Sequence, residues 1–278
     1  MGRVIVIGGG AAGMMAAVAA AESGGSVCLI EKNEKLGKKL FITGKGRCNV
    51  TNAGDMETLL ANVCTNGKFL YSAFYDYDNR AVMEFLEREG CPLKTERGDR
   101  VFPVSDHSSD VIGAFQRALK RLGVKVLLNT RVKGLMLEGE NGEERIAGVE
   151  LADGRTLPAD RCIVCTGGIS YPATGSTGDG YRFAEETGHK LTERRPSLVP
   201  FNIREKWCRQ LMGLTLKNVS VRLCCPPSRE VYRGFGEMLF THFGVSGPLI
   251  LSASSFIGQK GRKTGKKAGP ETEAGARL

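Results

Sequence analysis

Six residues near the N-terminus have the types and spacing that suit binding of a phosphate group: Gly8-Gly9-Gly10-Ala11-Ala12-Gly13. Glycines in this arrangement allow a tight turn and let the backbone approach a pyrophosphate closely. Glu31 lies 18 residues beyond Gly13, close to the roughly 20 residues at which an acid hydrogen-bonds an adenosine ribose. Because its carboxylate would repel a 2′-phosphate, the pattern disfavours NADP at this position.

The elements that must position these residues are also visible in the sequence. Residues 4–7 form a short apolar run typical of a buried parallel strand, and residues 11–23 predict a helix that ends at Gly24-Gly25. A second apolar strand over 27–30 leads directly to Glu31. A glycine cluster alone is a weak signal in a chain with 37 glycines. The ordered strand, turn, helix, strand and acid together predict a dinucleotide site with the phosphate at the helix N-terminus.

Length and composition are those of an ordinary globular protein. The chain has 278 residues, 41% hydrophobic and 25% charged, which suggests one large domain or two. Residues 4–21 carry no charge, but three consecutive glycines and many alanines argue against a membrane span or a signal peptide. Val6 stands where a myristoylation signal requires Ser or Thr. We therefore expect a cytoplasmic protein.

Charge and cysteine content exclude several other classes. The net charge is +9, but residues 259–278 contribute +4 of it, and the remaining basic residues are mixed with acids. This favours a solvated surface and an anionic cofactor over nucleic acid. The nine cysteines show neither disulfide-like nor zinc-like spacing, so we expect no metal. Cys162 and Cys165 would face opposite sides of a strand, which predicts core residues rather than a redox pair.

A second candidate for ligand contact is the stretch from residue 37 to residue 52. It lacks the spacing of a Walker A motif. Its glycines, basic residues and short polar residues suit a loop that wraps a phosphate-bearing ligand. The alternative is an exposed basic loop.

The rest of the chain alternates helices and strands. Asn79 is the candidate cap of the first of these helices. Predicted helices span 79–89, 109–122 and 181–187. Predicted strands comprise a hairpin over 93–104, a strand over 124–128, an antiparallel meander over 135–138, 146–151 and 155–157, and a buried strand over 162–165. The meander turns are expected at 140–142 and 153–154, and further strands broken by prolines are expected over 191–233.

Four ordered stretches carry a family resemblance over residues 3–258. They are Gly46-Arg47-Cys48-Asn49-Val50-Thr51-Asn52, Thr166-Gly167-Gly168-Ile169-Ser170-Tyr171-Pro172, Thr174-Gly175-Ser176-Thr177-Gly178-Asp179-Gly180 and Leu239-Phe240-Thr241-His242-Phe243-Gly244-Val245-Ser246-Gly247-Pro248. With the N-terminal motif, they closely resemble the BaiN-type bacterial NAD(P)/FAD-dependent oxidoreductases, which are two-dinucleotide-domain-like flavoproteins. The resemblance implies an α/β fold: a Rossmann-like FAD-binding domain, with a parallel sheet and a β-meander, and an inserted β-rich domain.

The same resemblance implies bound FAD, rather than NAD, and assigns residues to it. Gly8, Gly10, Ala11, Ala12 and Gly13 would lie at the pyrophosphate, Glu31 at the adenosine ribose, and the backbone of Val132 at the adenine. The other implied cofactor-binding residues are Lys32, Lys39, Gly46, Arg47, Cys48, Asn49, Thr51, Thr166, Gly167, Gly168 and Asp179. No catalytic acid or base is identified. His242, between Phe240 and Phe243, is interpreted as structural, with a catalytic role as the alternative.

The resemblance also sets the expected domain limits and function. Residues 1–190 would form the FAD-binding domain without its C-terminal return segment, 191–258 the start of the inserted substrate domain, and 259–278 a disordered tail unlike the family. A truncated chain is expected, with a natural short form as the alternative. The implied activity is FAD-dependent and NAD(P)H-linked reduction of an unsaturated small molecule, without nucleic acid or membrane partners. Alternatives are a non-enzymatic FAD- or nucleotide-binding protein, a small-amine oxidase and a flavoprotein acting on RNA. The substrate and the oligomeric state are left open.

Overall fold

The computed structural model describes residues 2–139, 144–227 and 229–257. It divides into two compact units, each described by itself. The first comprises Met1–Leu59 and Leu70–Thr192, and the second comprises Leu60–Phe69 and Glu193–Leu278. The tail predicted over 259–278 and the meander turn predicted at 140–142 lie outside the described residues. The interpretation of the second unit as an inserted substrate domain stays a prediction.

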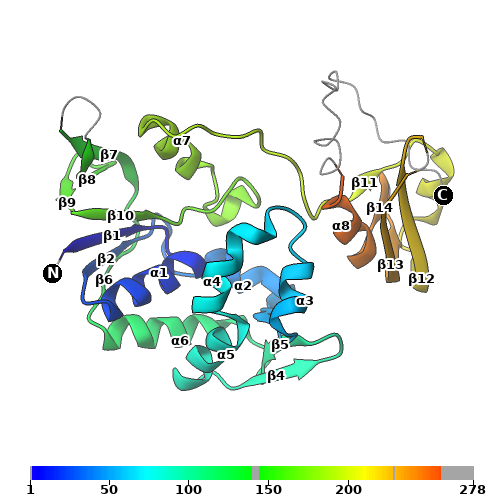
Figure 1. The fold of residues 1–278 in the computed structure, drawn as a ribbon, viewed down its shortest axis with the longest axis horizontal. Coiled ribbons are helices and arrows are strands. Elements are labelled where there is room, and N and C mark those ends of the chain that lie inside the picture. Colours follow the sequence, from blue (N-terminus) through cyan, green and yellow to red (C-terminus); the bar gives the residue numbers. More distant parts are fainter. Residues whose placement is uncertain (1, 140–143, 228, 258–278) are drawn as a thin grey trace. The chain divides into compact units, whose positions relative to one another are not determined.

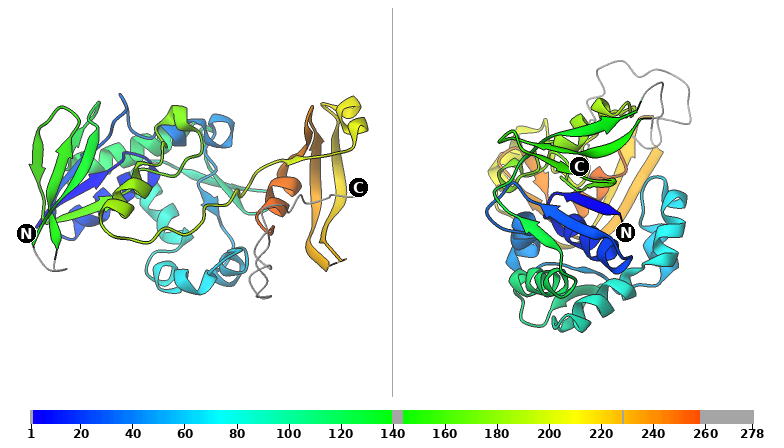
Figure 2. Two further views of the ribbon diagram at one scale, coloured as in Figure 1. Left: turned by 90° about the horizontal axis from the view of Figure 1, so that it is seen from above. Right: turned by 90° about the vertical axis from the view of Figure 1, so that its left-hand side faces the viewer.

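A four-stranded parallel sheet forms the centre of the first unit, in the order β10-β1-β2-β6. Its strands are β1 (Arg3–Ile7), β2 (Ser26–Ile30), β6 (Lys125–Leu127) and β10 (Arg161–Val164). Helices α1 (Ala11–Glu22) and α6 (Ser108–Arg121) lie on one face of the sheet. The antiparallel meander β7 (Val132–Glu138), β8 (Arg145–Leu151) and β9 (Thr156–Pro158) lies on the other (Figures 1 and 2). The Rossmann-type α/β fold predicted from the sequence is confirmed.

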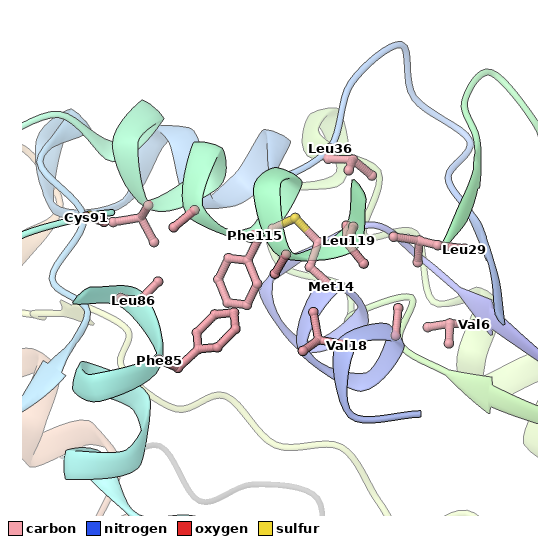
Figure 3. Close-up of a cluster of buried hydrophobic side chains, with 14 of the residues drawn as sticks. Val6, Met14, Val18, Leu29, Leu36, Phe85, Leu86, Cys91, Phe115 and Leu119 are labelled. Atoms are coloured by element: carbon pink, nitrogen blue, oxygen red, sulfur yellow. The ribbon is translucent and has the colours of Figure 1, made fainter. Parts of the chain in front are cut away.

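Strand alternation divides the core of the first unit into two clusters, because successive side chains of a strand point to opposite faces. On the helix face, Val6 and Leu29 pack with Met14 of α1 and with Phe115 of α6. Phe115 also meets Phe85, with ring centroids 5.2 Å apart (Figure 3). On the meander face, Ile5, Ile7 and Ile30 pack with Val149, Leu151 and Phe183. The sheet is therefore covered on both faces by apolar side chains.

The paired cysteines follow the same alternation. Cys162 packs in the meander-side cluster, whereas Cys165 packs against the helix-side cluster. Burial raises the pKa of both thiols, that of Cys162 to about 11. The prediction that the two side chains face opposite sides and do not form a redox pair is consistent with this placement.

Between β2 and α6 the chain carries short elements, of which residues 60–69 belong to the second unit. They are α2 (Lys38–Ile42), the 3-10 turn η1 (Thr43–Gly46), β3 (Thr51–Asn52), α3 (Met56–Ala61), the 3-10 turn η2 (Gly67–Leu70), α4 (Tyr71–Asp76), α5 (Asn79–Arg88), β4 (Leu93–Glu96) and β5 (Arg100–Pro103). Strands β3, β5 and β4 form a small antiparallel sheet, and the hairpin predicted over 93–104 is confirmed. The 3-10 turn η3 (Pro172–Thr174) and helix α7 (Asp179–Glu186) follow β10.

Two local predictions in this region are wrong. The stretch 37–52 is not one loop, because α2 and η1 occupy its first half. Asn79 is not the cap of α5: Asp78 caps it by accepting a 2.8 Å hydrogen bond from the Ala81 amide. Asn79 makes another contact instead, and its Nδ2 donates to the carbonyls of Asn52 and Gly54. Asp and Asn cap helices about equally well, so residue type alone could not decide between neighbours.

The second unit is built on an antiparallel sheet in the order β11-β14-β13-β12. Its elements are β11 (Phe201–Asn202), the 3-10 turn η4 (Lys206–Leu211), β12 (Thr215–Cys225), β13 (Arg229–Phe240), β14 (Gly244–Ser246) and α8 (Pro248–Ser254). Met238, Phe240, Val245 and Ile250 form its core. His242 is exposed and its ring meets that of Phe243 edge-on, at 4.9 Å between centroids. No helix in the described residues has the length and apolar character to cross a membrane.

Candidate dinucleotide site

A cavity of about 700 Å³ opens in the first unit at the carboxyl ends of the parallel strands. Gly8 follows β1, Glu31 follows β2 and Thr166 follows β10, and all three line the cavity. Open α/β sheets bind ligands at this edge, and the volume lies within the range of ligand pockets, about 300–1,000 Å³. The fold thus brings the glycine turn, the acid and the Thr166-Gly167-Gly168 turn to one place.

The glycine turn is shaped by close backbone approaches. Gly8 has φ +106°, and a Cβ there would lie 2.5 Å from the Cys165 carbonyl oxygen. A Cβ at Gly13 would lie 1.7 Å from the Gly8 carbonyl oxygen, so this glycine lets α1 pack on the turn. A Cβ at Gly10 would meet no protein atom within 4 Å in the described part of the chain. Two of the glycines therefore serve packing, and Gly10 leaves open space at the cavity.

Helix α1 presents its N-terminus to this space. Gly10 is its N-cap residue, and no side chain among the described residues caps the helix. The first four amides of a helix have no partner within the helix, and the helix dipole adds a partial positive charge there. Ala11 and Ala12, in the first turn, line the cavity. This end of α1 therefore suits an anionic group such as a pyrophosphate.

Glu31 has a structural role beside any ligand role. It is 7% exposed, and its Oε2 accepts a 2.6 Å hydrogen bond from the Gly9 amide. Its Oε1 accepts from the backbone amide of Asn33 at 2.8 Å and from the Asn33 side chain at 2.7 Å. The carboxylate therefore fixes the glycine turn to the end of β2, while the residue still lines the cavity.

One carboxylate pairs with two of the cavity's cations. Asp179 accepts from Lys32 Nζ at 2.7 Å and lies 3.7 Å from the guanidinium of Arg131. Burial opposes the charge of Asp179, but the hydrogen bond and the charge of Lys32 outweigh it and hold the pKa of the carboxyl below its usual range. Asp179 thus ties the start of α7 to the end of β2 and neutralises part of the positive charge.

Lys39 differs from the other cations. Its Nζ donates to the Ser170 carbonyl at 2.7 Å and to the Ser176 hydroxyl at 2.6 Å. Lys38 pairs with Glu34 at 3.2 Å, whereas no carboxylate within the described part of the chain pairs with Lys39. Its positive charge is therefore available to an anion in the cavity.

The cavity contains most, but not all, of the residues assigned from the sequence. Those that line it are Gly8, Gly10, Ala11, Ala12, Glu31, Lys32, Lys39, Val132, Thr166, Gly167, Gly168 and Asp179. Those that do not are Gly13, Gly46, Arg47, Cys48, Asn49 and Thr51. Cys48 is buried in the helix-side core, and the Arg47 side chain pairs with Glu96 and Asp106. Whether these six residues contact a cofactor stays a prediction.

Sequence reasoning missed several lining residues. They include Asn33, Thr43, Thr130, Arg131, Ser176 and Tyr181. Four of them adjoin or belong to stretches that the sequence had singled out: Asn33 follows Glu31 closely, Arg131 precedes Val132, Thr43 lies within residues 37–52, and Ser176 within 174–180. Each could have been included as a neighbour, but nothing local indicates which side chain points into a cavity.

The fold defines a Rossmann-type domain, with the cavity at the edge of the sheet where such domains bind ligands. The chain belongs to the family described as HI0933-like protein Rossmann domain, whose sequence model matches residues 2–264. This confirms the family predicted from the motifs.

The chain is also similar to curated proteins, of which two are described here. It is 33% identical over 273 residues to the 3-dehydro-bile acid delta(4,6)-reductase of Clostridium scindens, covering 96% of the chain and 63% of that protein. It is 31% identical to the ribosomal RNA dihydrouridine synthase of Haemophilus influenzae, covering 84% of the chain and 56% of that protein. The chain thus spans less than two thirds of these relatives' lengths.

Solved structures support the fold. An open conformation of a flavocytochrome c3 fumarate reductase matches with a TM-score of 0.56 at 20% identity, over 82% of this chain and 49% of that one. The 3-ketosteroid delta1-dehydrogenase of Sterolibacterium denitrificans also matches with a TM-score of 0.56, at 16% identity, over 78% of this chain and 62% of that one. At such identities the similarity concerns the fold alone.

Proposed function

We propose that this chain binds FAD and belongs to an oxidoreductase that reduces a carbon–carbon double bond conjugated with a carbonyl group. The observation that carries the proposal is the cavity at the end of β1, where Gly10 leaves open space before the uncapped N-terminus of α1. The fit to an anionic dinucleotide is good, because Lys39 supplies a cation on the same cavity that no described carboxylate neutralises. FAD, when bound, supplies the transfer of a hydride.

The chain's own residues would hold the cofactor in defined roles. The α1 amides and Lys39 would hold the diphosphate, and Glu31 would accept from the adenosine ribose while it anchors the Gly9 amide. Val132, at 5% exposure, lies at the cavity and would present its backbone to the adenine. Thr166, in the turn after β10, would line the cofactor. These residues bind and orient, and none is assigned a proton transfer.

The activities in the names of two relatives support the proposed substrate class. A delta(4,6)-reductase acts on double bonds, and dihydrouridine is uridine whose C5–C6 double bond, conjugated with a carbonyl, is saturated. Both reactions add a hydride to one carbon and a proton to the other, a reduction by two electrons. NAD(P)H, as the proposed donor, would supply the hydride and leave as NAD(P)⁺. We propose a small conjugated ketone as substrate, because the chain is more similar to the reductase (33% identity) than to the synthase (31% identity).

A second candidate substrate is uridine in ribosomal RNA. It is favoured by the two synthase relatives, of Haemophilus influenzae at 31% and Escherichia coli at 28% identity. The chain's charge of +9 agrees with such a partner, although much of that charge lies in the last twenty residues. The affinity for RNA would depend steeply on salt concentration, whereas the affinity for a small uncharged ketone would not.

The first experiment tests the cofactor. The purified 278-residue chain is denatured and released flavin is quantified, and the chain freed of flavin is titrated with FAD. Gly10→Val should abolish binding, because its side chain would fill the space before α1. Gly134→Val is the matched control, since a Cβ at Gly134 in β7 also meets no described atom within 4 Å but lies outside the lining. No flavin and no FAD binding in the unmodified chain would refute the proposal.

The second experiment separates the substrates. Anaerobic reduction by NADH or NADPH is followed by the flavin absorbance, and re-oxidation is then measured with a 3-oxo-4,6-diene steroid or with unmodified ribosomal RNA. We expect re-oxidation by the steroid. Re-oxidation by RNA alone would select the second candidate, and a chain that holds FAD but accepts electrons from neither nicotinamide would indicate a binding protein instead of an enzyme.

A further inference from the structure

A loop beside the cavity has an unusual backbone. Gly44, Lys45, Gly46 and Cys48 have φ values of 56°, 59°, 87° and 59°, all in the left-handed region that non-glycine residues rarely adopt. Thr43, immediately before this loop, lines the cavity. Residues held in such conformations persist only where their surroundings fix them. The contacts that hold residues 44–48 therefore also affect the position of Thr43 at the cavity.

Inside the loop, the core and the backbone supply part of the restraint. Cys48 is 2% exposed and packs in the helix-side core. Its amide donates to the Thr43 carbonyl at 3.1 Å, and the Arg47 amide donates to the Gly44 carbonyl at 3.2 Å. Thr43 is thus linked to Cys48 through one hydrogen bond, and its neighbour Gly44 is linked to Arg47 through another.

Outside the loop, the side chain of Arg47 supplies a further restraint. Its guanidinium donates to Glu96 at 2.5 Å and to Asp106 at 2.6 and 2.9 Å. It also lies over the ring of Phe102, 4.2 Å from the centroid. Lys94 donates to the second oxygen of Asp106 at 2.7 Å. A planar guanidinium held by two carboxylates and one ring has little freedom to rotate.

We propose that Arg47 is a positioning residue for the cofactor site: it fixes the left-handed loop 44–48 against β4 and β5, and thereby sets Thr43 at the cavity. The effect on FAD rests on the proposed function, whereas the effect on the loop does not. Arg47 then acts through the loop and does not bind the cofactor itself, which differs from the contact that the sequence resemblance implies.

The charges of the cluster support this arrangement. The hydrogen bond from Arg47 lowers the pKa of Glu96, and those from Lys94 and Arg47 lower the pKa of Asp106 below its usual range. These groups are partly exposed, so such ion pairs add little to global stability. Loss of Arg47 should therefore affect the loop and the cofactor more than the melting temperature.

Three variants test the proposal through the affinity for FAD. If the loop of the Arg47→Met variant adopts the conformation that binds FAD only about a tenth of the time, the apparent Kd for FAD rises about tenfold. Arg47→Lys should recover part of this loss. Arg100→Met is the matched control, because Arg100 also lies over the Phe102 ring, at 5.8 Å, but does not anchor the loop. An Arg47→Met chain with unchanged FAD affinity would overturn the proposal.

The carboxylates distinguish positioning from direct contact. The double variant Glu96→Ala, Asp106→Ala keeps Arg47 and removes both of its carboxylate partners. If Arg47 positions the loop, this variant binds FAD more weakly. If Arg47 bound the cofactor directly, releasing it would leave the affinity equal or higher, and the proposal would be wrong.

Cleavage of the loop gives a readout that needs no flavin. Lys45 is exposed within the loop, so endoproteinase Lys-C can report its freedom in the chain without cofactor. Faster cleavage after Lys45 is expected in Arg47→Met and in the double carboxylate variant, but not in Arg100→Met. Equal rates in all chains would overturn the proposal even if none binds FAD, whereas failure of the unmodified chain to bind FAD would refute only the proposed function.

Discussion

Replacing Glu31 by Gln separates the structural role of this carboxylate from its proposed role at the ribose. The glutamine side chain can keep one oxygen near Asn33, where Oε1 of Glu31 accepts two hydrogen bonds. Its NH₂ group then faces the Gly9 amide, which in the unmodified chain donates to Oε2 at 2.6 Å. A donor is placed against a donor at a site that is 7% exposed.

The magnitude follows from that mismatch. A buried donor without a partner costs about 1–3 kcal/mol. For a domain of this size, about 2 kcal/mol corresponds to a fall of roughly 4–8 °C in melting temperature. If Glu31 also accepts from the ribose, losing a charged acceptor costs a further 1.5–3 kcal/mol or so in binding, a rise of roughly 10- to 100-fold in the Kd for FAD.

Two assays read these effects separately. Thermal unfolding without flavin gives the melting temperatures of the unmodified chain and of Glu31→Gln. Fluorescence titration with FAD, at a temperature where both are folded, gives their Kd values. Glu84→Gln is the control: it is the same change at an exposed residue of α5 that does not line the cavity, and it should alter neither. A lower melting temperature with an unchanged Kd would show that Glu31 is not the ribose ligand, and no change in either would refute the reasoning.

Three further outcomes follow from the structure. Gly13→Ala should lower the melting temperature, since overpacking costs about 1–3 kcal/mol and its Cβ would lie 1.7 Å from the Gly8 oxygen; an unchanged melting temperature would contradict this. Burial raises the pKa of Cys162 to about 11, so this thiol should resist alkylation in the folded chain at about pH 8, near the ordinary thiol pKa. It should react once the chain is unfolded, and equal alkylation rates in both states would contradict the raised pKa. The Asp179 pair with Lys32 should stabilise the fold above the ordinary carboxyl pKa and be lost as pH falls through the lowered one. In Asp179→Asn, the stability of the chain should therefore fall less as the pH is lowered through this range. An acid unfolding transition identical to that of the unmodified chain would refute the stabilising role of the pair.

Much of the first unit could be predicted because its signals are local. The strands β1, β2 and β10 are short apolar runs, and each ends at a glycine turn or at Glu31. Helix α6 shows Val111, Phe115 and Ala118 at helical spacing, and all three are buried. Periodicity and turn residues depend on the chain within a few positions, so they can be recognised without the fold. The parallel pairing of β10 with β1 follows once the crossover elements are known.

The walls of the cavity could be predicted only in part, because they are made by pairs distant in sequence. Lys39 reaches Ser176 across 137 residues, and Lys32 reaches Asp179 across 147. The resemblance supplied three of these residues, but only the structure shows that Lys32 is neutralised by Asp179, whereas no described carboxylate neutralises Lys39. The difference matters for function, because a cation already paired offers little to a diphosphate.

Arg47 shows why a motif and a contact are different statements. The stretch from Gly46 to Asn52 indicates that the loop belongs to a flavoprotein site, but the partners of its arginine lie 49 and 59 residues further along the chain. Those partners, Glu96 and Asp106, flank a strand that the sequence identified only as half of a hairpin. An arginine with two carboxylates and an aromatic ring has its hydrogen bonds largely filled, so its value to the site is the shape that it imposes. A residue can therefore belong to a cofactor-binding motif because it holds the backbone that binds, and not because it touches the ligand.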